Sequence, residues 1–480
     1  MREHGSGALV ALDAHPLLRE YFGQRLRDAQ PEVWRAAHRR LYEHLCATTE
    51  DKPNATLEDL QPLYQAVAHG CHAGMQQEAC AKVYRDRIQR GIEAYSTKKL
   101  GALGSDLGAV ACFFETPWSR VSLAVTEASQ AWLLNEAAFT LRALGRLTEA
   151  LEPMRVSGEM DVRVEHWDGA GRSYSNLSEL ELTLGEVAGA VGDAEQSVTY
   201  ADRSSDAFVR TVFRTTHADA LHQAGRRDEA EARFREAERM QAERQPAYPL
   251  LYSLAGFLYC DLLLWPGARE AGKAEGDLKN HNSLDLCRTV AERATQTLKW
   301  MTDAKLGLLD IALDHLTLGR AALYHAILEP RSRQRKPAQH SSPPPSEESQ
   351  RGFTTAATKL DHAVSGLRRA GMQDYLPHGL LTRAWLRSLT GARTGTESAQ
   401  SDLDEAWEIA ERGPMPLFLA DIHLYRARLF FRDAKYPWES PQHDLAEARR
   451  LIFKHGYLRR KEELEDAEAA LKQFVDASAR

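Results

Sequence analysis

The stretch Gly145-Arg-Leu-Thr-Glu149-Ala150 decides the fold of this chain, because three other segments repeat its pattern. They are Gly74-Met-Gln-Gln-Glu78-Ala79, Gly185-Glu-Val-Ala-Gly189-Ala190 and Gly225-Arg-Arg-Asp-Glu229-Ala230. In each segment a glycine is followed five residues later by an alanine, and helical patterning flanks both sides. Glycine adopts a left-handed backbone conformation at little cost, so the pattern predicts a helix, a tight turn and a second helix that runs back.

The side chains after each glycine indicate how the two helices pack. The alanine lets them approach closely, and a larger residue four positions later, such as Met154 or Phe234, fills the space between neighbouring pairs. A small residue three positions further, such as Ser157 or Ser197, meets the next pair. These features resemble the tetratricopeptide repeat, which implies an all-α, right-handed α-solenoid of antiparallel helix pairs. The last three glycines are 40 residues apart, against a usual period of about 34, so longer helices or connections are expected.

Weaker helical patterns continue the array. They cover residues 308–324, 357–363, 380–389, 399–410, 417–431 and 445–453, and a charged helix over 459–474 is expected to cap the solenoid. Residues 329–352 contain basic residues and the run Ser341-Ser-Pro-Pro-Pro-Ser-Glu-Glu-Ser, which cannot bury apolar surface, so a disordered, dispensable insertion is predicted there. No sustained alternation of apolar and polar residues occurs, so strands are not expected.

The predicted organisation has four parts. Residues 1–50 form a separate helical segment, residues 51–328 carry repeats, residues 329–352 are the insertion, and residues 353–480 carry further repeats and the capping helix. The chain of 480 residues has 61 Lys plus Arg and 68 Asp plus Glu, a net charge of −7, which argues against a nucleic-acid partner.

The sequence also indicates the cellular compartment of the protein, through its apolar segments and its cysteines. No window approaches 18 uninterrupted apolar residues, and the first residues lack the apolar run of a signal peptide, so neither a membrane span nor a membrane partner is expected. Six irregularly spaced cysteines suit a reducing cytoplasm rather than a disulfide scaffold.

The N-terminal segment differs in character from the repeats. Leu12-Asp-Ala-His-Pro-Leu-Leu-Arg-Glu-Tyr-Phe22 leads into a helical pattern that includes Trp34. It is similar to the stretch that ends the winged-helix part of bacterial STAND-class NTPases of the NACHT type and leads into their superhelical repeats. The resemblance implies the sensor or regulatory region of such a protein. With no partner domain, Leu17, Tyr21 and Trp34 would be partly exposed, and the chain could associate with itself.

The NTPase resemblance does not extend to nucleotide chemistry. The phosphate-binding loop Gly-x-x-x-x-Gly-Lys-Ser/Thr does not occur in the sequence, so the chain by itself is expected neither to bind nor to hydrolyse ATP. Any nucleotide would be held by another polypeptide or by a preceding domain.

Two clusters of side chains in the sequence could suit a chemical site. His69, Cys71, His72 and Cys80 have metal-binding side chains, but they align on the turn at Gly74 and buried cysteine commonly packs as a small apolar residue, so neither a metal nor another cofactor is expected.

The second cluster, Asp219 and His222, lies one helical turn apart and suggests acid–base chemistry. A groove-lining helix explains the pair equally well, and no hydrolase or zinc-protease motif occurs, so no catalytic residue is assigned.

The leading hypothesis is a non-catalytic scaffold that binds a protein, peptide or small effector in its groove and reports to an NTPase or effector domain in signalling or defence. Two alternatives stay open: the superhelical part of a transcriptional activator, and an enzyme with an unrecognised site. Tetratricopeptide geometry predicts that the ligand-binding concave face carries Asn135, Phe139, Arg142, Glu179, Thr215, Asp219 and His222.

Overall fold

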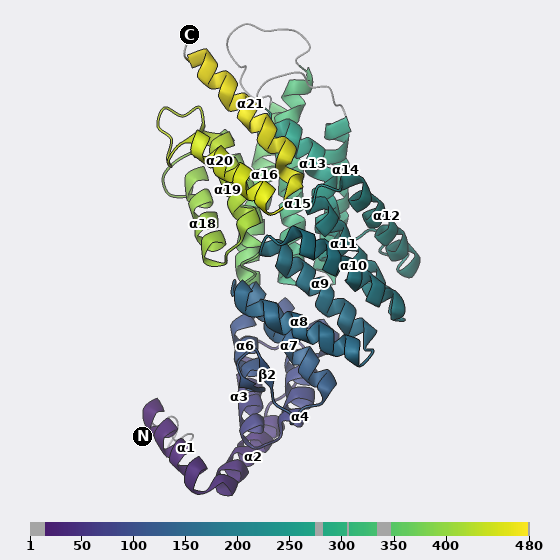
Figure 1. Cartoon of the computed structure of the whole chain (residues 1–480), viewed down its shortest axis with the longest axis vertical. Coiled ribbons are helices and arrows are strands. Elements are labelled where there is room, and N and C mark those ends of the chain that lie inside the picture. Colours follow the sequence, from purple (N-terminus) through teal and green to yellow (C-terminus); the bar gives the residue numbers. More distant parts are fainter. Residues whose placement is uncertain (1–14, 274–281, 305–306, 334–346, 479–480) are drawn as a thin grey trace.

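The computed structural model describes residues 15–273, 282–304, 307–333 and 347–478, and most of these residues are helical. Consecutive helices pack against one another, which confirms the all-α solenoid of antiparallel pairs. Figure 1 shows an elongated molecule with α1 at one end and α21 near the other. The first half contains α1 (Pro16–Ala29), α2 (Pro31–Thr48), α3 (Leu57–His72), α4 (Gln76–Glu78), the π-helix η1 (Ala79–Ile88), η2 (Gly91–Glu93), α5 (Tyr95–Lys98), α6 (Leu103–Ala111), α7 (Glu127–Ala143), α8 (Leu147–Arg163), α9 (Trp167–Thr183), α10 (Val187–Arg203), α11 (Ala207–Gln223) and α12 (Arg227–Arg244).

The second half begins after α12. It contains α13 (Ser253–Gly272), α14 (Asn282–Asp303), α15 (Leu308–Arg333), α16 (Glu347–Ala370), α17 (Leu376–Leu389), α18 (Ala399–Arg412), α19 (Pro416–Phe430), α20 (Pro441–Lys454), the short turn η3 (Leu458–Arg460) and α21 (Lys461–Ser478). Its apolar residues form one large core together with those of α6 to α9, so the two halves are packed on each other.

The four repeat glycines lie at the turns between paired helices. Gly74, Gly145, Gly185 and Gly225 have φ values of 82°, 77°, 82° and 79°, in the left-handed region that only glycine enters at little cost. At each of the last three turns the N–H of the following residue donates to a carbonyl in the preceding helix, as in a Schellman cap. The turns therefore depend on glycine for a backbone reason.

Small side chains bring the repeat helices together. Ala150, Ala190 and Ala230 are fully buried. The hydroxyl of Ser157 donates to the carbonyl of Ala131 at 2.8 Å, and that of Ser197 donates to the carbonyl of Gly171 at the same distance. A serine at this position thus fills little space and also satisfies its own buried hydroxyl.

A short hairpin corrects the expectation that the chain lacks strands. β1 (Phe114–Thr116) pairs antiparallel with β2 (Arg120–Val121) between α6 and α7. Pro117 cannot continue a helix, and Trp118 has a left-handed φ of 59°, so the chain reverses tightly. Strands of three and two residues are too short to show an alternating pattern in the sequence.

The prediction of a disordered insertion over 329–352 is wrong at both of its ends. Residues 329–333 belong to α15 and residues 347–352 to α16, so both stretches are helical. The two helices pack closely, since a Cβ added at Gly352 would lie 2.8 Å from the Cβ of Ala326. The composition of residues 329–352 does not reveal that α15 and α16 pack against each other, and this packing extends both helices. The remainder of the predicted insertion, 334–346, lies outside the described residues.

The second half folds back onto the turns of the first-half repeats. The contacts are the Gln373 N–H donating to the Ala143 carbonyl (2.8 Å), His455 Nδ1 at the Gly185 carbonyl (2.9 Å), and Leu458 against Gly225. We call this line of contacts the seam. It closes the superhelix across its own inner face.

The N-terminal helix α1 stands apart from this closed body (Figure 1). None of its residues is buried, and Leu17 and Tyr21 are 67% and 54% exposed. Trp34 in α2 is half-buried, because its ring packs edge-on against His38 and His72.

Candidate functional site

The residues predicted on the concave face lie on α7, α9 and α11, the first helices of three consecutive pairs. They do not line an open groove, because α13, α17 and α19 and the segment at Tyr457 lie across it. Five of the seven are buried and two half-buried: Asn135, Arg142, Thr215, Asp219 and His222 in the first group, Phe139 and Glu179 in the second. The closure at the seam therefore replaces the expected groove with a shorter pocket between the two halves, open to solvent on one side, which we call the chamber.

This chamber has a volume of about 690 Å³ when the part open to solvent is included. Three of the seven predicted residues, Arg142, Glu179 and Asp219, line it, whereas the other four do not. The remaining lining comes from Leu182, Thr183, Gln223, Phe257, Leu258, Asp261, Asp374, Tyr375, His378, Leu417, Phe418 and Tyr457. Charged groups thus share the chamber with aromatic and aliphatic side chains.

Arg142 forms the charged centre of one wall. Its guanidinium lies 2.7 Å from Glu179 Oε2, and its Nε donates to Asp374 Oδ2 at 2.8 Å. Burial raises the pKa of Asp374, and Arg142 lowers it only in part. In the described structure Asp374 Oδ1 has no hydrogen-bond partner. One buried cation is therefore shared between two carboxylates, which leaves this wall with a net negative charge.

Asp219 lies on the wall formed by α11. Gln223 Nε2 donates to its Oδ1 at 2.7 Å, and no ion pair involving it is found among the described residues. Burial raises the pKa of Asp219 to about 7, and the nearby carboxylates of Asp261 and Glu179 add to the shift. This carboxyl group therefore changes charge near neutral pH.

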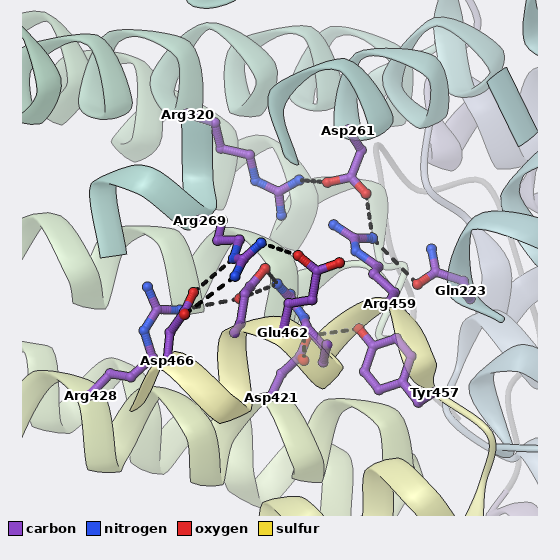
Figure 2. Close-up of polar contacts among 12 residues, drawn as sticks. Gln223, Asp261, Arg269, Arg320, Asp421, Arg428, Tyr457, Arg459, Glu462 and Asp466 are labelled. Atoms are coloured by element: carbon purple, nitrogen blue, oxygen red, sulfur yellow. Dashed lines mark hydrogen bonds and ion pairs between the residues drawn. The ribbon is translucent and has the colours of Figure 1, made fainter. Parts of the chain in front are cut away.

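Asp261 on α13 is compensated, in contrast to Asp219. Arg459 Nη1 lies 2.5 Å from its Oδ2, and Arg320 Nη1 donates to its Oδ1 at 2.9 Å. Burial alone would raise the pKa of Asp261, but the two guanidinium groups hold it well below its usual range. Arg459 also donates to the side-chain oxygen of Gln223 at 3.3 Å, which connects this pair to α11 (Figure 2).

The ion pairs continue from Asp261 into the C-terminal helix. Figure 2 shows how they join α13, α15 and α19 to η3 and α21. The network comprises six arginines, Arg227, Arg269, Arg320, Arg428, Arg459 and Arg460, and five carboxylates, Asp261, Asp421, Glu462, Glu463 and Asp466. Every arginine is paired with at least one of these carboxylates, so the network acts as a structural link. The first turn of α21 contributes to this network through Glu462 and Glu463, and Glu463 is only 3% exposed.

Asp219 and His222 do not form the acid–base pair that their spacing suggested. His222 is fully buried, and in the described structure neither of its ring nitrogens has a hydrogen-bond partner. Burial holds its pKa well below the usual value. His378, which lines the chamber, has its pKa lowered to about 3 by burial and by Arg320. Both rings are therefore neutral at physiological pH.

The cysteine–histidine segment does not assemble a metal site. Within the described residues no group of three or more His, Cys, Asp or Glu side chains could hold a metal ion. His69 instead lies against His38, with 2.8 Å between their Nδ1 atoms, and His72 contacts the same ring. Cys80 is buried in the core, as expected for a packing residue.

Sequence reasoning missed the half of the chamber that comes from the second half of the chain. Asp374 follows its partner Arg142 by 232 residues, in the turn before α17. Asp261 and Tyr457 likewise belong to elements with no repeat glycine to align them. No local pattern identifies these residues, because only the closure at the seam brings them to the repeat helices.

Comparisons with known proteins add little to this description. No family model matches the chain, and no curated protein matches its sequence. Among solved structures, the fold is similar to that described as "Crystal Structure of Rap Protein Complexed with Competence and Sporulation Factor". The TM-score is 0.44 and the identity 9%, over 95% of this chain and 98% of that one. No functional conclusion follows from a likeness at this level. In the part of the chain that the structure describes, no helix has the length and apolar content of a membrane span.

Proposed function

We propose that the chain is a non-catalytic helical-repeat scaffold that binds a peptide, a protein segment or a small effector in the chamber. The position of the chamber is the observation that carries this proposal. It lies between the first helices of three repeats, α7, α9 and α11, and the helices α13, α17 and α19 of the second half. A bound ligand would contact both halves, so its binding free energy would favour the closed superhelix over an opened one.

The ion-pair network between the two halves supports a closure that can reverse. The desolvation of buried ion pairs offsets much of their attraction, so they contribute geometry more than net stability. The segment from Tyr457 to Asp466 is held in this network (Figure 2). A change in chamber occupancy would therefore be passed to the C-terminal helix through contacts that separate more readily than an apolar interface.

We further propose that this response is passed to a separate NTPase or effector polypeptide in a STAND-type bacterial signalling or defence system. The resemblance of residues 9–46 supports the assignment. The sequence lacks the phosphate-binding loop, so nucleotide would be held by another polypeptide.

The proposal can be tested with a displayed library of random decapeptides, selected on the full chain. Thr183 lines the chamber and is half-buried, so Thr183→Trp should occupy the ligand space. Thr199→Trp places the same side chain at an exposed site on α10 and serves as the matched control. Selected peptides should bind at least tenfold more weakly to Thr183→Trp than to wild type or the control, as measured by calorimetry.

Equal binding to both tryptophan variants would place the peptide site outside the chamber and refute the proposal. A library that yields no binder would refute the scaffold role itself.

A further inference from the structure

We infer that the chamber recognises a cationic group, a primary ammonium or a guanidinium, carried on an apolar body. The inference rests on the proposed function and names the class of its ligand. It follows from the charge balance of the lining, from an unsatisfied buried oxygen and from the apolar side chains around them.

The lining has an excess of negative charge. Asp261 is paired with Arg320 and Arg459, which reach it from outside the chamber. Together with Arg142, these two arginines set three cations against the four carboxyl groups of the lining, so one negative charge is left over when all four are ionised. Of the remaining groups, Arg142 is the one cation and faces three carboxyl groups, those of Glu179, Asp219 and Asp374. Two of these already share its guanidinium. A ligand that brings a positive charge would compensate the excess, whereas an anionic ligand would increase it.

Asp374 carries an unused acceptor at this site. Its side chain is 1% exposed and lines the chamber, and its Oδ1 has no hydrogen-bond partner in the described structure. An unpaired buried carboxylate oxygen is costly, because it has lost water without gaining a donor. Ammonium and guanidinium groups carry only donors, so either could supply the missing hydrogen bond once the enclosed carboxylate of Asp374 turns toward the chamber.

The rest of the lining suits an apolar body. Phe257 and Leu258 from α13 and Leu417 and Phe418 from α19 contribute apolar surface to the lining. Aliphatic and aromatic surface of this kind covers the carbon skeleton of a ligand, and aromatic faces also attract cations. The chamber therefore selects for a cation that has an adjoining apolar group over a simple hydrated ion.

The nearby arginines do not provide an alternative anion site. Arg459 and Arg320 are paired with Asp261, and Arg460 is paired with Asp421 and Glu463. In the wider network, Arg227, Arg269 and Arg428 are likewise paired with carboxylates of α21, so none of these arginines is left without a counter-charge for an anion to replace.

Binding of a cation should be linked to proton release from Asp219. The charged groups around it are Arg142, Glu179, Asp261, Asp374 and Arg459, and His378 is neutral. Tyr375 and Tyr457 also stay neutral, because burial raises their pKa values. Asp219 is therefore the chamber group that titrates near neutrality, and a cationic ligand should bind more tightly as the pH rises from 6 to 8.

Calorimetry on the full chain with two neutral-backbone dipeptides tests the inference. Ac-Phe-Arg-NH2 carries the cation, and Ac-Phe-citrulline-NH2 has nearly the same shape without the charge. The arginine dipeptide should bind at least tenfold more tightly at pH 8, and its advantage should shrink at pH 6. Asp219→Asn and Glu179→Gln should each remove most of the advantage, and Asp219→Asn should also remove its pH dependence.

Glu408→Gln, which changes an exposed side chain on α18, should leave both affinities unchanged. Circular dichroism spectra of the variants should match that of the wild type, which checks that each variant is folded. Equal affinity for the two dipeptides, or no binding of either, would overturn the inference. The proposed function would still stand if neutral peptides from the library bound the wild type and bound Thr183→Trp more weakly. The failure of the inference and the failure of the proposed function are therefore distinguishable.

Discussion

Replacing the four turn glycines one at a time with alanine separates their two roles. All four have φ between 77° and 82°, so each alanine meets the same left-handed backbone penalty, roughly 1–2 kcal/mol. Their surroundings differ. At Gly74 a new Cβ would meet nothing within 4 Å, and at Gly145 its nearest neighbour would be 3.7 Å away. At Gly225 it would lie 2.9 Å from the Cβ of Leu458, in the seam.

These distances set the expected order of destabilisation. Alanine restricts the unfolded chain, which offsets part of the penalty, so Gly74→Ala and Gly145→Ala should each cost about 1 kcal/mol. Gly225→Ala adds overpacking, which typically costs about 1–3 kcal/mol. The carbonyl carbon of Leu458 would also be 3.2 Å away, so the backbone itself must move. We expect a total of about 2–4 kcal/mol.

Gly185→Ala should cost at least as much as Gly225→Ala, about 2–4 kcal/mol. Its Cβ would lie 2.4 Å from Pro416 Cγ and 2.6 Å from His455 Nδ1. The proline ring is closed onto its own backbone nitrogen and cannot rotate away, so relief of this contact requires backbone movement as at Gly225.

Urea unfolding of the four variants measures the free energies. Hydrogen exchange of residues 457–466 should also quicken in Gly225→Ala and stay at the wild-type rate in Gly74→Ala, because only the first change disturbs the seam. A Gly225→Ala loss within 0.5 kcal/mol of the Gly74→Ala loss, with unchanged exchange, would refute the role of the seam.

Three further predictions concern buried charge. Asp261→Asn leaves two buried guanidinium groups without their shared carboxylate and should lower the free energy of unfolding by roughly 3–5 kcal/mol; a urea midpoint equal to that of Glu408→Gln would contradict this. The pKa of Asp219 is about 7 in the folded chain and about 3.9 when unfolded, so this group destabilises the fold increasingly between those pH values. Asp219→Asn should therefore be more stable than wild type by roughly 2–4 kcal/mol at pH 8 and by less at pH 5, and thermal melts with no such difference would argue against the shift. Burial and the two neighbouring histidines lower the pKa of His38 to about 4, below the unfolded value of about 6.5. The contribution of neutral His38 to stability is therefore lost as the pH falls from about 6.5 to about 4, and α2 should loosen from α3 over this range. Trp34 fluorescence should report the loosening, and His38→Phe should abolish it; a pH-independent wild-type signal would count against the cluster.

The local parts of the fold could be predicted because their causes lie close together in the chain. The glycine and the alanine five residues later specify a turn and a close helix contact within one repeat, and both are present at Gly145 and Gly225. The hairpin at Pro117 and the helical ends of the predicted insertion were missed. The first is too short for a pattern, and the second depends on packing between α15 and α16.

The candidate site divides in the same way. Arg142, Glu179 and Asp219 could be chosen from repeat geometry, since they lie on the inner side of successive first helices, Glu179 and Asp219 at equivalent positions and Arg142 one turn further along. Repeat geometry could not show that the second half covers these positions. It also could not show that Asp374 pairs with Arg142. Each repeat adds a small rotation to the superhelix, and only their sum brings the second half across the inner face.

The sequence by itself thus determined the helix pairs, their turns and which side chains face inward, because periodicity and glycine chemistry act within one repeat. Only the tertiary structure decided that the inner face becomes a chamber. Its charge balance depends on residues such as Arg142 and Asp374, which lie 232 positions apart. Residues so far apart in the chain come into contact only when the second half closes onto the first at the seam. No local pattern encodes the total rotation of the repeats that brings about this closure.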